Sequence, residues 1–171
     1  HIVLQRNLLE INYKDLEGID VVVNLASPGV SPKKAPFSEL FEINVMSSVN
    51  LMNHSKKAGV SRFVCTGTAY EYGKEAEKID KIPPDYPLKP IGDYAESKVA
   101  AFYILKNLAI EYGIIFLYPR IFSTYGKGQY EKNFWPSLYK AAIKGEDFLM
   151  TKGRQIFDFI RVEIFYKIFI C

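Results

Sequence analysis

Three short, continuous apolar segments constrain the fold of this 171-residue chain more than any other feature: residues 20–25, 62–66 and 114–118. Their apolar side chains follow one another without alternation, which is typical of strands buried on both faces of a sheet. Two long segments with apolar residues at helical spacing, residues 37–58 and 93–112, separate them. This alternation is that of βαβ units, so the sequence predicts an α/β fold with a doubly wound parallel sheet.

Weaker patterns extend this arrangement toward both ends of the chain. Residues 1–4 form a candidate strand, residues 133–143 a shorter helix, and residues 155–162 a final strand. Two segments rich in proline, glycine or polar residues, 67–91 and 122–132, are predicted as loops. In parallel α/β sheets, ligands bind beyond the carboxyl ends of the strands, so functional residues are expected directly after each strand.

Composition and charge exclude several classes of protein. With 49% hydrophobic and 24% charged residues, the chain is too apolar for a disordered segment. The net charge of +3 comes from scattered lysines, so no nucleic-acid partner is predicted. No apolar run reaches the length of a membrane span, and the cysteines, Cys65 and Cys171, form no disulfide framework. We therefore expect a cytoplasmic protein without a membrane partner, and His54 has no neighbouring ligands that predict a metal site.

The strongest candidate for chemistry is the pair Tyr94 and Lys98 at the start of the second long helix. Residues four apart on a helix lie on one face, one turn from each other. A phenol ordinarily keeps its proton until about pH 10, and a nearby ammonium favours the phenolate and lowers that pKa. Such a pair can exchange a proton with a hydroxyl or a carbonyl group. The same spacing occurs at Tyr70 and Lys74, so an ordinary helix surface is the alternative interpretation.

Thr68 follows the strand at residues 62–66 and therefore lies at the carboxyl edge of the predicted sheet. If the helix that carries Tyr94 and Lys98 packs beside this strand, Thr68 can hydrogen-bond the substrate oxygen that Tyr94 protonates. A hydroxyl, a phenol and an ammonium suit the interconversion of a carbinol and a ketone. That interconversion needs a hydride carrier, which side chains cannot supply.

Six motifs, in this order along the chain, together resemble the extended short-chain dehydrogenase/reductases, the NAD-dependent epimerase/dehydratase family. They are Val-Val-Asn-Leu-Ala at 22–26, Asn-Val at 44–45, the Thr-containing strand and loop at 63–73, Tyr-Ala-Glu-Ser-Lys at 94–98, Arg-Ile-Phe-Ser-Thr-Tyr-Gly at 120–126 and Asp-Phe-Ile at 158–160. Each motif is weak alone, whereas the set is specific. The resemblance implies a Rossmann-like fold and a nicotinamide cofactor, with NAD favoured over NADP.

Roles follow from the resemblance. Tyr94 is the expected acid/base, Lys98 lowers its pKa, and Thr68 holds the substrate oxygen. The expected cofactor-binding residues are Asn7, Leu8, Leu25, Ala26, Ser27, Asn44, Thr66, Tyr94, Lys98 and Phe122. The expected substrate-binding residues are Thr68, Ser123 and Asn133, which predicts a nucleotide-sugar as the bound partner. Asn44 could instead only tie a helix to a neighbouring loop, and Thr66 and Phe122 could only pack in the core.

The chain also departs from the family pattern. The family's Gly-x-Gly-x-x-Gly loop lies N-terminal to every residue present, so we expect the chain to lack the first βαβ unit and to bind cofactor poorly or not at all. Residues 1–163 are expected to be a partial dinucleotide-binding domain with the start of the substrate region. Most of the substrate domain is expected to be absent, and the apolar residues 164–171 form an atypical tail that could be non-native. Phe157 stands where the family has an arginine.

One departure distinguishes reactions within the family. Sugar-nucleotide 4,6-dehydratases carry Asp-Glu directly after the catalytic threonine, whereas this chain has Ala69 and Tyr70. We therefore expect an oxidoreductase or epimerase that acts on a carbinol of a nucleotide-sugar, with epimerase or 4-ketoreductase chemistry. The alternatives are a non-catalytic NAD(P)-binding sensor or scaffold and an inactive truncated fragment. By the same resemblance, the helices at 37–58 and 93–112 could form a homodimer interface, or they could simply cover the sheet.

Overall fold

The computed structural model describes residues 7–30, 34–154 and 156–169, which fall into two compact units, residues 1–120 and 121–171. The predicted strand at residues 1–4 lies outside the described residues. The elements of the first unit are β1 (Val21–Asn24), α1 (Phe37–Phe41), the π-helical η3 (Glu42–Ser47), α2 (Ser48–Ala58), β2 (Arg62–Cys65), β3 (Gly67–Thr68), α3 (Asp93–Tyr112) and β4 (Ile115–Leu117).

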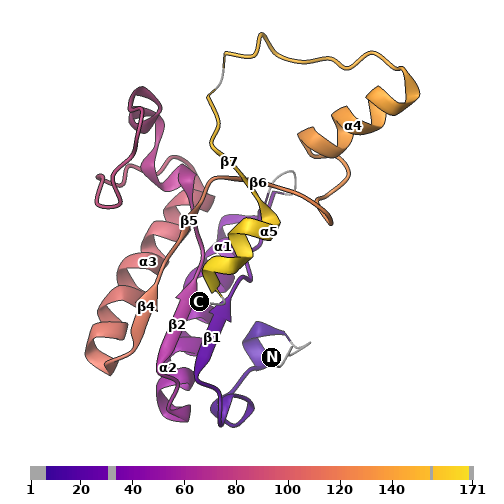
Figure 1. Ribbon diagram of the computed structural model, residues 1–171. Coiled ribbons are helices and arrows are strands. Elements are labelled where there is room, and N and C mark those ends of the chain that lie inside the picture. The colour runs from indigo at the N-terminus through magenta and orange to yellow at the C-terminus, as the bar shows by residue number, and fades with distance from the viewer. Residues whose placement is uncertain (1–6, 31–33, 155, 170–171) are drawn as a thin grey trace. The chain divides into compact units, whose positions relative to one another are not determined.

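A parallel sheet in the order β1–β2–β4 forms the centre of the first unit (Figure 1). Val23 pairs with Val64, and Val64 pairs with Leu117, so the three strands run in register. Their carboxyl ends therefore lie at one edge of the sheet, followed by the segments that begin at Leu25, Thr66 and Tyr118. The predicted parallel α/β architecture is confirmed.

Two long helical segments pack on one face of this sheet. The first runs through α1, η3 and α2 and ends at Gly59, and the second, α3, ends at Gly113. Both glycines have a positive φ, the left-handed conformation that commonly closes a helix. The core between helices and sheet is formed by Phe63, Met52 and Leu105, which are fully buried. Both predicted helices are thus confirmed within one residue at each end.

The opposite face of the sheet differs from the prediction. The continuous apolar strands predicted cover on both faces, but Val23 is 40% exposed and Ile115 is 65% exposed. The physical reason is that α2 and α3, within the described part of the chain, pack on the same side. The apolar residues of these strands therefore indicate burial on both faces of the sheet, whereas the described helices cover one face only.

The segments predicted as loops contain short regular elements. Residues 67–91 begin with β3, which forms a two-stranded sheet with β5 (Arg120–Ile121), and continue with two 3₁₀ turns, η4 (Ala69–Tyr72) and η5 (Lys74–Lys78). Two further 3₁₀ turns, η1 (Leu8–Glu10) and η2 (Tyr13–Leu16), precede β1. These turns follow local capping side chains such as Asn7 and Asn12, not hydrophobic periodicity.

The second unit contains β6 (Ser123–Tyr125), α4 (Phe134–Lys144), β7 (Phe159–Arg161), α5 (Val162–Phe165) and the 3₁₀ turn η6 (Tyr166–Phe169). β6 and β7 pair in parallel, which corrects the prediction of a loop at 122–132 and shortens the strand predicted at 155–162. The rings of Tyr125, Trp135 and Phe159 pack together with centroids 5.5–6.5 Å apart. The apolar residues from 164 to 169 are helical, and the predicted division at residue 163 stays a prediction.

Candidate functional site

A ring of hydrogen bonds connects the loop after β1, the helical turn η3 and the first turn of α3. Ser27 Oγ donates to Asn44 Oδ1 at 2.8 Å, and Asn44 Nδ2 donates to Ser97 Oγ at 2.9 Å. Ser97 Oγ in turn donates to the Tyr94 carbonyl oxygen at 2.8 Å, while the Tyr94 phenol is hydrogen-bonded to the Ser27 side chain. This set of four residues, the Asn44 ring, fixes Tyr94 beside the carboxyl end of β1.

Asn44 lies in a π-helical turn, a form of helix that is rare and often found at functional sites. Its side chain is buried and uses both its oxygen and its nitrogen in the ring. The interpretation in which Asn44 ties a helix to a neighbouring loop is therefore confirmed, because the loop that it holds carries Ser27. Its cofactor-binding role stays a prediction. Ser97 was not singled out from the sequence, since a serine inside a helix carries no signal of its own.

Lys98 points inward from α3 and is 3% exposed. Its Nζ donates to the Thr66 carbonyl oxygen at 3.0 Å, directly after β2. Among the described residues this is the only acceptor that the amino group reaches, so further donor capacity stays available. Burial lowers the pKa of Lys98, and the neighbouring Cys65 and Glu71 act in the opposite direction. The pair Tyr94 and Lys98 is therefore not an ordinary helix surface.

The pKa of Tyr94 is raised, opposite to the direction expected from the sequence. Burial of the phenol is the main cause, the hydrogen bond with Ser27 acts against it, and the neighbouring Glu71 and Tyr70 add to the increase. Lys98 does not offset this, because its ammonium is directed at the Thr66 carbonyl. In this form of the chain Tyr94 holds its proton at neutral pH, the state needed to donate a proton to a ketone oxygen.

Thr68 is buried and begins the 3₁₀ turn η4. Its Oγ1 accepts from the Tyr70 amide at 3.4 Å, and its own amide donates to Glu71 Oε1 at 2.8 Å. Glu71 also contributes to the pKa values of Tyr94 and Lys98, which indicates that this loop lies close to the first turns of α3. The segment β3 that holds Thr68 packs against α3.

Glu71 also lies near this site, in an interior position that the sequence did not predict. Its carboxylate is fully buried and accepts hydrogen bonds from Arg120 Nε at 2.7 Å and from the Tyr118 hydroxyl at 3.1 Å, besides the Thr68 amide. A carboxylate in the interior requires such partners, because an unpaired buried charge is strongly unfavourable. The capping pattern Thr-x-x-Glu at 68–71 is the sequence signal that could have revealed the contact between Glu71 and Thr68.

The remaining predicted cofactor residues of the first unit differ in their exposure to solvent. Leu25 and Ala26 are exposed at the carboxyl end of β1, and Thr66 is buried above Lys98. Asn7 accepts from the Leu9 amide at 3.1 Å and so caps η1, with Leu8 half-buried behind it. An acceptor side chain and exposed apolar residues fit the edge of a dinucleotide, and their binding roles stay predictions.

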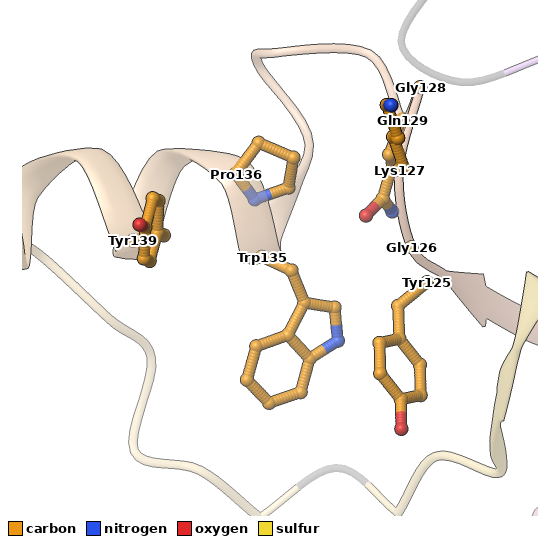
Figure 2. A pocket seen from close by; sticks show the side chains of 8 residues that line it. All are labelled: Tyr125, Gly126, Lys127, Gly128, Gln129, Trp135, Pro136 and Tyr139. Carbon is orange, nitrogen blue, oxygen red and sulfur yellow. The ribbon is translucent and has the colours of Figure 1, made fainter.

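Phe122, Ser123 and Asn133 belong to the second unit. Phe122 is partly exposed, Ser123 is the first residue of β6, and the Asn133 carbonyl accepts from the Ser137 amide at the start of α4. This unit holds a hollow of about 570 Å³ in which Tyr125, Trp135 and Tyr139 supply rings and Lys127 and Gln129 supply polar groups (Figure 2). None of the predicted site residues lines it.

The described part of the chain lacks two further kinds of feature. It contains no cluster of three or more histidine, cysteine, aspartate or glutamate side chains arranged to hold a metal ion. Nor does any of its helices have the length and apolarity needed to cross a membrane.

A parallel sheet with a Tyr-x-x-x-Lys pair beside its carboxyl edge defines a Rossmann-like α/β protein. The family model described as "NAD dependent epimerase/dehydratase family" matches residues 3–170. The chain therefore belongs to the NAD-dependent epimerase/dehydratase family, as the sequence motifs predicted.

Individual relatives agree with this assignment. A UDP-glucose 4-epimerase of Lactobacillus helveticus is 26% identical over 166 residues, covering 86% of this chain and 49% of the relative. The human sterol-4-alpha-carboxylate 3-dehydrogenase (decarboxylating) is 28% identical over 162 residues, covering 88% of this chain and 40% of the relative. The chain thus spans about half the length of these curated relatives, or less.

Solved structures show the same fold. MoeE5 in complex with UDP-glucuronic acid and NAD superposes with a TM-score of 0.81 at 28% identity, covering 98% of this chain and 56% of that chain. A UDP-glucuronic acid 4-epimerase from Bacillus cereus, also in complex with UDP-glucuronic acid and NAD, gives a TM-score of 0.80 at 24% identity, covering 94% of this chain and 51% of that chain. At that identity the second comparison supports the fold alone.

Proposed function

We propose that the whole protein is an NAD(P)-dependent epimerase or 4-ketoreductase that acts on a carbinol of a nucleotide-linked sugar. The observation that carries this proposal is the buried Lys98, one helical turn from Tyr94, with its ammonium at the carboxyl edge of β2. A lysine is almost never fully buried unless it is paired or functional, and here its single acceptor among the described residues is a neutral carbonyl group.

The residues present fit a nicotinamide cofactor. Lys98 keeps donors that can reach the ribose hydroxyls, and Leu25, Ala26 and Ser27 offer a partly exposed strand end along which the cofactor can lie. When bound, the cofactor supplies hydride transfer to or from the carbinol carbon. The complexes of MoeE5 with NAD and a UDP-sugar, at 28% identity, favour NAD and a nucleotide-sugar for this chain as well.

The side chains of the chain then handle the proton. The Tyr94 phenol donates its proton to the ketone oxygen in reduction and removes it from the carbinol hydroxyl in oxidation. Thr68 hydrogen-bonds the same oxygen, and the donors of the Lys98 ammonium that do not face Thr66 stabilise the phenolate that forms. The raised pKa of Tyr94 keeps this residue protonated and so favours the donor role at the start of a reduction.

Elimination of water, as in a 4,6-dehydratase, is disfavoured. Ala69 and Tyr70 stand where those enzymes have carboxylic acids. The one carboxylate in this turn, Glu71, is fully buried and is held by Thr68, Tyr118 and Arg120. It is therefore not available as the proton donor that elimination needs.

A substitution of Tyr94 by phenylalanine in the whole protein tests the proposal. We expect Tyr94→Phe to lower turnover of UDP-sugars roughly 100-fold or more, because it removes the acid/base while keeping the ring. Tyr103→Phe is the matched control, since Tyr103 lies on the same helix and is 52% exposed. Steady-state rates, followed by chromatography of the UDP-sugar products, report both variants, because an epimerase regenerates its nicotinamide in each turnover and gives no net change in absorbance. Turnover of Tyr94→Phe within a few-fold of wild type would reject the assignment.

A second candidate function is suggested by the human sterol dehydrogenase, which is 28% identical to this chain. A hydroxysterol presents the same carbinol to Tyr94 but carries no diphosphate. The same assay with UDP-sugars and with sterol-4-alpha-carboxylates distinguishes the two substrate classes. Turnover of the sterol alone would move the proposal to that class and leave the roles of Tyr94 and Lys98 unchanged.

A further inference from the structure

The buried ion pair of Glu71 and Arg120 lies directly beneath the loop that carries Thr68. The Glu71 side chain is fully buried, and the Arg120 side chain is 10% exposed. The Arg120 guanidinium carbon lies 4.5 Å from the ring centre of Phe102, 5.3 Å from that of Tyr72 and 5.5 Å from that of Tyr118. Arg120 is therefore enclosed by aromatic faces and cannot easily turn away from Glu71.

The two carboxylate oxygens of Glu71 accept hydrogen bonds from different partners. Oε2 accepts from Arg120 Nε at 2.7 Å, which anchors the side chain. Oε1 accepts from the Thr68 amide at 2.8 Å and from the Tyr118 hydroxyl at 3.1 Å. The single proton of the Tyr118 hydroxyl is shared between Glu71 Oε1 and the Lys98 carbonyl oxygen, which lies at 2.9 Å, so Tyr118 connects the carboxylate to the backbone of α3.

Gly67 indicates that this arrangement tolerates little displacement. A Cβ atom at Gly67 would overlap Glu71 Oε1 and the ring of Tyr118. The backbone before Thr68 therefore passes in close contact with the carboxylate, and only glycine allows that approach.

We propose that Glu71, anchored by Arg120, is a positioning residue that sets Thr68 and the first turns of α3 in their catalytic geometry. The proposal rests on the proposed function, since it concerns the same site. Glu71 touches no substrate in this role, and it acts through the Thr68 amide and through Tyr118.

The charge of Glu71 also acts on the site. The negative charge of Glu71 favours a higher pKa for both Tyr94 and Lys98. Burial is the larger influence on each group: it also raises the pKa of Tyr94, whereas it lowers the pKa of Lys98. The other titratable or charged groups around Glu71 are Cys65, Tyr118 and Arg120, with Tyr70 and Tyr72 in its own turn. Removing the charge therefore lowers the pKa of Tyr94, and the rise of oxidation rate with pH moves to lower pH.

Two single variants of the whole protein test the proposal: Glu71→Gln and the matched control Glu75→Gln. Glu75 lies four residues further on, and its ion pair with Lys89 is 58% exposed on both sides. We expect Glu71→Gln to lower kcat roughly 10- to 100-fold with KM changed less than about 3-fold, because a small displacement of a catalytic group is costly. In this variant, the rise of the oxidation rate with pH should occur at lower pH than in the wild type. Glu75→Gln should change neither.

A double variant separates positioning from stability. Glu71→Leu with Arg120→Met removes both buried charges, and such apolar replacement often leaves stability unchanged. Recovery of the melting temperature without recovery of kcat supports the proposal, whereas recovery of both, or an oxidation rate that rises at the same pH in Glu71→Gln as in the wild type, overturns it. If Glu71→Gln does not fold, Arg120→Lys, which keeps the charge but loses the planar geometry, takes its place in the same assays.

Hydrogen–deuterium exchange makes this test independent of the reaction. Faster exchange of residues 67–73 in Glu71→Gln than in Glu75→Gln supports the positioning role, and equal exchange overturns it. Absence of turnover in the wild-type protein with every UDP-sugar and sterol would count against the proposed function, while the exchange data would still decide the role of Glu71.

Discussion

At the scale of single residues, burial controls the reactivity of Cys65 at the end of β2. Its sulfur lies 3.9 Å from Asn24 Nδ2, and burial raises its pKa to about 11, with Lys98 acting in the opposite direction. The thiolate is the reactive form, and with that pKa about one thiol in a thousand is ionised near pH 8. In a Cys171→Ser background, we expect Cys65 to resist a disulfide reagent until the protein is denatured. Rapid stoichiometric labelling of the folded protein would contradict this.

The same thiol makes stability depend on alkaline pH. Its folded pKa of about 11 exceeds the ordinary value of 9.0, so the contribution of the neutral thiol is complete below pH 9 and is lost as the pH rises through 11. A difference of this size corresponds to about 2–3 kcal/mol at most. We expect wild type to lose more free energy of unfolding over this interval than Cys65→Ala, measured by urea denaturation. Parallel curves for the two proteins would contradict the shift.

At the scale of elements, the π-helical turn η3 connects the first helical segment to α3 through Asn44. Asn44→Ala removes the hydrogen bonds to Ser27 and Ser97 and leaves buried hydroxyl groups with fewer partners. We expect a loss of about 1–3 kcal/mol in the free energy of unfolding, together with lower turnover because Tyr94 is no longer fixed. Thermal and urea unfolding of the whole protein measure the first effect, and steady-state rates measure the second.

Asn53→Ala is the control for this prediction. Asn53 lies on α2, and its side chain accepts from the Tyr112 hydroxyl at 2.8 Å in an exposed position. An exposed hydrogen bond contributes little, so this variant should lose at most about 0.5 kcal/mol and keep full turnover. Equal losses in the two variants would show that the position of Asn44 in the ring has no special importance.

Hydrophobic periodicity predicted most of the elements of the first unit. The strand at residues 62–66 and the helices that end at Gly59 and Gly113 follow from patterns within a single segment. The 3₁₀ turn η4 was missed because it depends on the capping interaction of Thr68 with Glu71 inside a segment rich in loop-forming residues. The exposed face at Val23 and Ile115 could not be foreseen, since an apolar strand carries no information on which face a helix covers.

The types of residue in the candidate site could be predicted from the sequence, but the hydrogen bonds that join them could not. Tyr94, Lys98 and Thr68 were identified from spacing and from position after a strand. The Asn44 ring joins side chains 17 and 53 positions apart, which no local pattern reveals. The pKa of Tyr94 was predicted in the wrong direction, because spacing places Lys98 on the same face but does not show that its ammonium faces Thr66.

At the scale of the whole molecule, the helical segments have a second apolar face. Their inner residues cover the sheet, as one interpretation of the sequence predicted. On the outer side, Met46 of η3 and Tyr103 of α3 are half exposed, and Phe37, Phe41 and Ile110 are exposed as well. Because η3 and α1 both pack against α3, these residues belong to adjoining elements. Covering the sheet and forming a dimer interface are therefore compatible roles for the same helices.

We predict that the whole protein is a homodimer in which these outer helical residues are buried. Introducing two charges by Met46→Glu with Tyr103→Glu should give a monomer, because burying unpaired carboxylates costs more than the apolar contacts contribute. Light scattering after size-exclusion chromatography measures the mass of each species. Tyr139→Glu is the control, since Tyr139 lies on α4 and is 69% exposed, and it should remain dimeric. A wild-type monomer, or a doubly charged variant that stays dimeric, would show that this face is not the interface.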